Sequence, residues 1–158
     1  MPLNSQAVAA IHVVVDRNAY SGYVVTCLVL ILNLLILWIF SGASRARGGV
    51  AINSEDGARY GASVSESEPP AVARVLRAHR NAEATIYPFL FLGLVYVLAG
   101  GGARTAIPLF SIFVLARIAH SIVYLKGLQP WRTVAFAASI LAIVALMAAV
   151  LRLWLTAT

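Results

Sequence analysis

The chain has 158 residues, of which 61% are hydrophobic and only 11% are charged, and this composition excludes an ordinary soluble domain. Its twelve Lys and Arg residues give a formal net charge of +6, but they are scattered among apolar stretches. They form no basic run with interleaved aromatic residues, so we expect no nucleic-acid partner. The sequence predicts an integral membrane protein that lies in a lipid bilayer.

The first apolar stretch predicts a transmembrane helix at about 21–40. Its sequence, SGYVVTCLVLILNLLILWIF, is long enough to cross a hydrocarbon core of about 30 Å, and Asn33 is its only strongly polar residue. The preceding residues 1–20 lack the basic start of a secretory signal peptide and include Asp16 and Arg17. We interpret them as a short interfacial lead-in.

A polar segment follows at about 41–70. It is rich in Gly, Ser and charged residues, which is typical of a solvated loop without membrane character. Pro69 and Pro70 end it and favour a helix start directly afterwards, because proline fits the first turn of a helix.

Three further membrane helices are predicted at about 71–98, 107–125 and 132–155. The segments between the last three helices, AGGGARTA and KGLQPW, are short and rich in glycine or proline. Short connections favour antiparallel neighbours. The predicted fold class is therefore an all-α integral membrane protein, a four-transmembrane-helix antiparallel bundle in one membrane domain over residues 1–158.

The basic residues near the span ends predict an orientation. Four helices place both termini on one side of the membrane and the loops after the first and third helices on the other. The terminal side has Arg17, Arg104 and Arg152, and the opposite side has Arg45, Arg47, Arg59, Lys126 and Arg132. The excess of positive charge predicts that these two loops are cytoplasmic and that the termini lie on the opposite side.

Two of the predicted spans have polar residues at helical spacing. In the second helix the spacing is i, i+3, i+4 and i+7, and in the third it is i, i+3 and i+7, so each set forms one stripe. The stripes consist of Arg77, Arg80, Asn81 and Ala84 in the second helix and of Arg117, His120 and Tyr124 in the third. Glu83 is the only acidic residue in the spans, so internal counter-ions are too few. We expect the stripes to face each other around a cavity for an anionic ligand.

Structural explanations exist for single members of these stripes. Arg74 and Arg77 lie near a helix entrance, where their side chains can extend to the lipid headgroups, and His120 can be a buried histidine whose hydrogen bonds are satisfied. Arg117 is different, because it falls near the middle of its predicted span, where its charge reaches the headgroups least easily. Taken together, the stripes favour a ligand site.

Several motifs also resemble a known family. The runs LRAHRN at 76–81 and TIYPFLFLG at 85–93 are similar to the second helix of the prostaglandin E synthase branch of the MAPEG family, the membrane-associated enzymes of eicosanoid and glutathione metabolism. NSED at 53–56, RIAHSIVYL at 117–125 and PWRTV at 130–134 extend the resemblance over most of the chain. It implies a homotrimer of four-helix subunits with glutathione bound between neighbouring subunits near the cytoplasmic side.

The resemblance also implies roles for individual residues. Glutathione contacts carry over to Arg45, Arg77, Arg80, Asn81, Arg117, His120, Tyr124, Arg132, Thr133 and Phe136. Arg132 and Thr133 would face the thiol at the start of the fourth helix, where a fixed charge, a hydroxyl and the helix dipole favour thiolate over thiol. Asp56 matches an aspartate proposed as a proton acceptor, although NSED alone is also an ordinary helix-start signal.

Three positions depart from the family pattern. Ala84 stands where the family has a glutamate, and Glu83 is no replacement, because the next position on a helix is rotated by about 100°. Thr133 stands for a serine and keeps the hydroxyl, whereas Phe136 stands for a tyrosine and loses it. The missing glutamate predicts less ordered arginines or weaker glutathione binding.

The leading hypothesis is a glutathione-dependent membrane enzyme acting on a lipophilic small-molecule substrate. Isomerisation of prostaglandin H2 to an E2-type product, glutathione transfer and peroxide reduction all begin with the same thiolate, so the sequence leaves them open. The alternatives are a small organic-anion transporter, which also uses buried cations, and a non-catalytic structural membrane subunit. No metal site is predicted.

Overall fold

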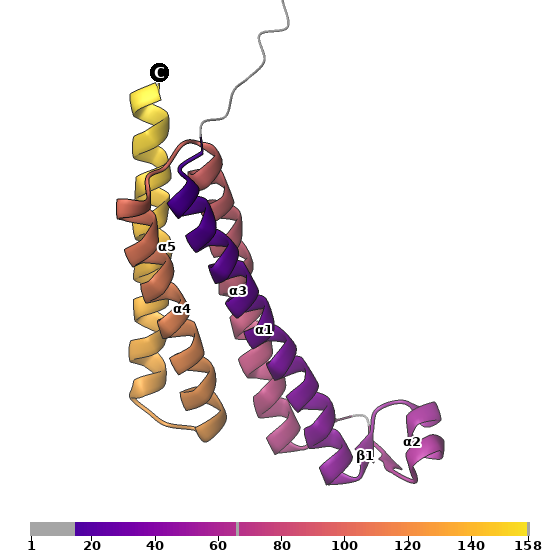
Figure 1. Cartoon of the computed structure of the whole chain (residues 1–158). Coiled ribbons are helices and arrows are strands. Elements are labelled where there is room, and N and C mark those ends of the chain that lie inside the picture. Colours follow the sequence, from indigo (N-terminus) through magenta and orange to yellow (C-terminus); the bar gives the residue numbers. More distant parts are fainter. Residues whose placement is uncertain (1–14, 66, 158) are drawn as a thin grey trace, which may run out of the picture.

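The computed structural model describes residues 15–65 and 67–157, and over this part the chain is mostly helical. In chain order the elements are α1 (Arg17–Gly48), β1 (Val50–Ala51), α2 (Ser54–Tyr60), β2 (Ser63–Val64), α3 (Pro70–Leu98), α4 (Ala103–Lys126) and α5 (Trp131–Ala157). Four of the described helices, α1, α3, α4 and α5, are long and apolar enough to cross a membrane, as predicted. Successive long helices run in opposite directions (Figure 1).

The long helices form two pairs, which lie close together toward the α3–α4 connection and spread apart toward the opposite end of the bundle (Figure 1). α1 lies along α3, and α4 lies along α5 (Figure 1). α2 and the two short strands lie at one end of the bundle, whereas the start of α1 and the end of α5 lie at the other (Figure 1). Most of the lead-in predicted for residues 1–20 lies outside the described residues.

The first helix is longer than the predicted span of 21–40. It begins after Asp16, whose carboxylate accepts hydrogen bonds from the backbone N–H groups of Asn18 and Ala19 at 2.8 and 3.0 Å. It ends at Gly48 and is capped by Gly49, which takes the left-handed conformation with φ of 59°. Hydropathy marks the part of a helix that matches the bilayer, and caps mark its ends. The span predicted from hydropathy is therefore shorter than the helix bounded by its caps.

The segment predicted as a plain loop at 41–70 contains regular structure. It includes the last two turns of α1, the short helix α2, and a parallel pair in which Val50 is opposite Ser63 and Ala51 is opposite Val64. The all-α prediction therefore omits one small two-stranded element. Runs of two residues are too short to produce a periodic sequence pattern.

Aromatic side chains hold α1, α3 and α4 together. The rings of Phe89 and Phe113 stack with centroids 3.7 Å apart, and Phe110 meets Phe89 edge-on at 5.9 Å. At Gly93 a Cβ atom would lie 3.2 Å from the Tyr23 ring, so the glycine allows α1 to approach α3 closely. This core lies between the membrane helices, and the predicted polar stripes lie beside it.

Candidate active site

Arg117 is the centre of a polar cluster where α3, α4 and α5 meet. Its side chain is fully buried, at 0% exposure. Nη2 donates to Oδ1 of Asn81 at 3.0 Å, and Nη1 lies 3.5 Å from Oγ of Ser139, a longer and weaker contact. Both partners are neutral, and no ion pair reaches Arg117 within the described residues, so its charge is not compensated there.

Four buried side-chain polar atoms lack a hydrogen-bond partner in the described part of the chain. They are Nε of Arg117, Nδ1 of His120, Oγ of Ser121 and, on α1, Nδ2 of Asn33. Buried polar atoms in folded proteins nearly always have partners. Three of the four belong to one stretch of α4, and such donors fit a polar, anionic ligand.

Aromatic rings form a wall next to the buried arginine. The ring centroids of His120 and Tyr124 are 5.5 Å apart, and those of His120 and Phe136 are 6.0 Å apart. The guanidinium of Arg132 lies over the Tyr124 ring, with Cζ 4.9 Å from its centroid. Arg132 is in the first turn of α5, where the unpaired backbone N–H groups add positive potential. The ring contacts therefore extend from His120, three residues after Arg117, through Tyr124 to Arg132 at the start of α5.

Thr133 is exposed next to Arg132, and Gln129 contacts both residues. With the Gln129 amide oriented to match its neighbours, its oxygen accepts from Nη2 of Arg132 at 2.6 Å. Its nitrogen then donates to Oγ1 of Thr133 at 3.2 Å. One amide thus links the two side chains that were predicted to face a thiol.

The stripe predicted on the second helix is divided in the structure. Asn81 faces Arg117, whereas Arg77, Arg80 and Ala84 are exposed on α3. Adjacent positions on a helix differ by about 100°, so a stripe of this width spans both a contact face and an open face. The prediction that the two stripes face each other along their full length is therefore wrong for Arg77 and Arg80 within one chain.

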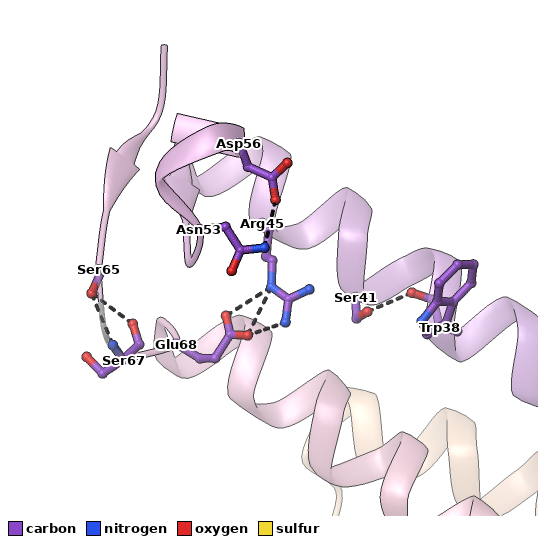
Figure 2. A network of polar contacts seen from close by, with 8 residues as sticks. All are labelled: Trp38, Ser41, Arg45, Asn53, Asp56, Ser65, Ser67 and Glu68. Carbon is purple, nitrogen blue, oxygen red and sulfur yellow. Dashed lines mark hydrogen bonds and ion pairs between the residues drawn. The ribbon is translucent and has the colours of Figure 1, made fainter. Parts of the chain in front are cut away.

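Arg45 and Asp56 belong to a second polar group, at the C-terminal end of α1. Both line a cavity of about 570 Å³ formed by the end of α1 and the residues up to Ala62. Nδ2 of Asn53 lies 3.5 Å from Oδ2 of Asp56, a distance at the limit of a hydrogen bond, and Arg45 is paired with Glu68 (Figure 2). Among the described residues, no hydrogen bond, ion pair or ring contact connects this group to the Arg117 cluster.

Comparison with known proteins places the chain in a family. The family model described as the MAPEG family matches residues 23–152. The chain belongs to the MAPEG family. This confirms the resemblance carried by LRAHRN and TIYPFLFLG, and together with the four apolar helices it makes this MAPEG protein a multi-pass integral membrane protein.

Individual relatives are similar over most of this MAPEG protein. Human prostaglandin E synthase is 36% identical over 124 residues, which are 78% of this chain and 82% of the relative. Prostaglandin E synthase of Macaca fascicularis is 35% identical over 137 residues, 86% of each chain. Rat microsomal glutathione S-transferase 1 is 35% identical over 126 residues, 77% of this chain and 81% of the relative.

Four residues in these polar groups, Ser121, Ser139, Gln129 and Glu68, were not singled out from the sequence of this MAPEG protein. Ser139 could have been found, because it is seven residues after Arg132 and three after Phe136, on the same helical stripe. Gln129 and Glu68 have no such signal. Each lies next to a helix start in a polar segment, and only the folded chain shows which arginine it contacts.

Proposed function

We propose that this chain is a glutathione-dependent enzyme of the membrane. The observation that carries the proposal is Arg117, a fully buried arginine whose Nε lacks a partner and whose described contacts are both neutral. A buried cation of this kind is costly in a membrane unless an anion binds it. Glutathione has two carboxylates, and the similar proteins include enzymes named glutathione S-transferase and prostaglandin E synthase.

The residues proposed to contact glutathione lie on the two polar stripes, in the last turn of α1 and in the first turns of α5. Arginines bind carboxylates through two parallel N–H donors, whereas asparagine, histidine and tyrosine orient the peptide. The residues in this proposal are Arg45, Arg77, Arg80, Asn81, Arg117, His120, Tyr124, Arg132, Thr133 and Phe136.

Arg132 and Thr133 are proposed to hold the thiol end. The guanidinium charge, the positive end of α5 and the Thr133 hydroxyl would all stabilise a thiolate at this place. When bound, glutathione would supply that thiolate as a nucleophile toward one oxygen of an endoperoxide, in a redox-neutral isomerisation: the ring carbon that loses its proton becomes a carbonyl, the other peroxide oxygen gains a proton and becomes a hydroxyl, and the thiolate is regenerated. Asp56 is the proposed acceptor of that proton.

A homotrimer is part of the proposal. Arg77 and Arg80 are exposed on a membrane helix, and in one chain no ion pair within the described residues involves either. A neighbouring subunit would remove these charges from lipid and place glutathione between subunits. The detergent-corrected mass of the purified protein tests the assembly, and a fully active monomer would contradict it.

The proposed orientation follows the positive-inside rule. The loops α1–α3 and α4–α5 would face the cytoplasm and the termini the opposite side. Accessibility of single cysteines introduced into each loop, measured in sealed vesicles, tests this orientation. Labelling of the α1–α3 loop from the non-cytoplasmic side would contradict it.

Turnover assays test the reaction itself. Purified protein is incubated with prostaglandin H2, with an aryl halide and with a lipid hydroperoxide, each with and without glutathione. Glutathione-dependent product supports an enzyme, and the substrate that reacts separates isomerase, transferase and peroxidase. Glutathione flux across proteoliposomes without product would instead indicate the transporter. The absence of both product and flux would indicate a structural subunit.

A further inference from the structure

A paired carboxylate fixes Arg45 at the end of α1. Nε of Arg45 donates to the two carboxylate oxygens of Glu68 at 2.9 and 3.2 Å, and Nη2 also donates to Oε1 of Glu68 (Figure 2). The two side chains are 34% and 16% exposed, so the pair is only partly open to solvent. Glu68 directly precedes Pro69, the N-cap of α3, so the pair connects the last turn of α1 to the start of α3.

Glu68 occupies one edge of the guanidinium and leaves another edge available. The contacts of Glu68 use Nε and Nη2, the side-on edge. Within the described residues, Nη1 of Arg45 makes no hydrogen bond. A guanidinium has five N–H donors in a fixed planar fork, so a second anion can still bind at the end that includes Nη1.

The cavity next to Arg45 is of the size and chemistry to receive such an anion. Its volume of about 570 Å³ lies within the range of small-molecule sites. Its lining includes the residues from Gly49 to Asn53, and Arg45 is the only cationic residue among the described residues that line it. An anionic group in this cavity would therefore pair with Arg45 and lie on the side away from Asp56, the acidic residue among the described lining residues.

We propose that Glu68 is a positioning residue for glutathione, which acts by holding Arg45 with its free edge available to a ligand carboxylate. This inference rests on the glutathione-dependent function proposed above. An arginine that is already held loses less conformational freedom when the ligand binds, so the ion pair raises affinity although Glu68 does not touch the ligand. Glu68 therefore affects binding more than the chemical step.

The variant Glu68→Gln tests this role. An amide can accept one hydrogen bond from Nε, but it places an NH2 group or a single oxygen where the carboxylate engages both nitrogens of Arg45. We expect the Kd for glutathione, measured by calorimetry, to rise by about two- to tenfold, the range for losing one pre-ordered side chain. The turnover rate at saturating glutathione should stay within about a factor of two of the wild type, because the thiolate site is not changed.

Matched variants separate positioning from loss of charge and from loss of fold. Glu55→Gln removes a carboxylate from the same polar segment. Among the described residues Glu55 has only the neighbouring Ser54 hydroxyl as a partner, so the Kd of this variant should equal that of the wild type. Glu68→Asp keeps the charge but is too short to engage both nitrogens equally, so its Kd should be intermediate. A melting temperature close to the wild type in each variant shows that the fold is retained.

A double-mutant cycle decides whether Glu68 acts through Arg45. In the Arg45→Gln background, Glu68→Gln should change the Kd no further, because the residue that it positions is gone. Three results would overturn the inference while leaving the proposed function intact. They are a Kd of Glu68→Gln equal to that of the wild type, tighter binding by Glu68→Gln, and independent effects of the two substitutions. Absence of glutathione binding by the wild type would overturn both.

Discussion

Arg117 on α4 donates a hydrogen bond at 3.0 Å to the side-chain oxygen of Asn81 on α3. The two residues belong to the two polar stripes, and the bond is the direct contact between them. Because an amide is neutral, the contact orients the guanidinium without neutralising it. The buried charge of Arg117 is therefore oriented but not compensated by its described partners.

Substitution of Asn81 is expected to separate stability from binding. Asn81→Ala leaves the buried Nη2 of Arg117 without a partner, which should lower the free energy of unfolding by about 1.5 to 3 kcal/mol, the range for hydrogen bonds to charged groups. Asn81→Asp should retain the stability, because a carboxylate pairs with Arg117. It should nevertheless weaken glutathione binding about tenfold, or about 1.4 kcal/mol, because it neutralises the cation.

Thermal melting and calorimetry with glutathione measure the two effects in each variant. If Asn81→Asp bound glutathione as tightly as the wild type, the charge of Arg117 would not contribute to ligand binding.

Restoring a carboxylate at position 84 is predicted to tighten glutathione binding. Ala84 is exposed on α3, so Ala84→Glu enlarges a side chain without disturbing the described core. The new carboxylate lies four residues after Arg80, where it can order that arginine, and it can accept from the ligand ammonium. Ala84→Gln is the control of equal size without charge. Equal or weaker affinity of Ala84→Glu, measured by calorimetry, would show that the site is satisfied in another way.

Arg132 is predicted to affect chemistry more than binding. One favourable charge contact of about 1.4 kcal/mol changes a thiolate-to-thiol ratio about tenfold, so Arg132→Ala should lower kcat at least about tenfold while the other arginines keep the Kd within a few-fold. Thr133→Val should cost less, because a neutral hydrogen bond stabilises an anion less than a full charge does. Arg132→Lys keeps the charge and serves as the control.

The readouts for Arg132 are turnover at saturating glutathione and the pH titration of the bound thiolate by its ultraviolet absorbance. If Arg132→Ala changed neither, Arg132 would be an interfacial anchor and the thiolate would be stabilised elsewhere.

Asp16 is predicted to make the stability of the protein sensitive to acid. It accepts hydrogen bonds from Ala103 N at the start of α4 at 3.0 Å and from two N–H groups of α1. These bonds, with that of Ala103 as the largest cause, hold the pKa of Asp16 below its ordinary value of 3.8. A depressed pKa stabilises the fold fully above the unfolded value, and this stabilisation is lost as the pH falls through the folded value.

Asp16→Asn should therefore lower the melting temperature at neutral pH and reduce its fall in acid. Melting curves from neutral pH to below 3.8 measure both effects. Glu55→Gln is the control, because Glu55 accepts from no described backbone N–H group and should leave the acid dependence as in the wild type. An acid dependence of Asp16→Asn equal to that of the wild type would contradict this role.

The sequence predicts the membrane part of the fold well for a physical reason. Spans must be long and apolar, and polar residues inside them must repeat with the helical period, so both the helices and the pairing of Asn81 with Arg117 leave a pattern. Arg45 and Glu68 leave none, because they lie 23 residues apart across a polar segment and meet only when the chain folds. The exposure of Arg77 and Arg80 is likewise set by which face of α3 the other helices cover, and the period alone does not specify this.

The absorbance of glutathione thiolate on the wild-type protein tests the central claim most directly. Glutathione is titrated into the purified protein at neutral pH, and the ultraviolet difference absorbance of the thiolate is followed with the bound heat in parallel. We expect a saturable thiolate signal that is removed by S-methylglutathione, a competitor that has no ionisable thiol. If both the thiolate signal and the heat of binding were absent, this would contradict the claim that this arginine-rich cluster binds and activates glutathione.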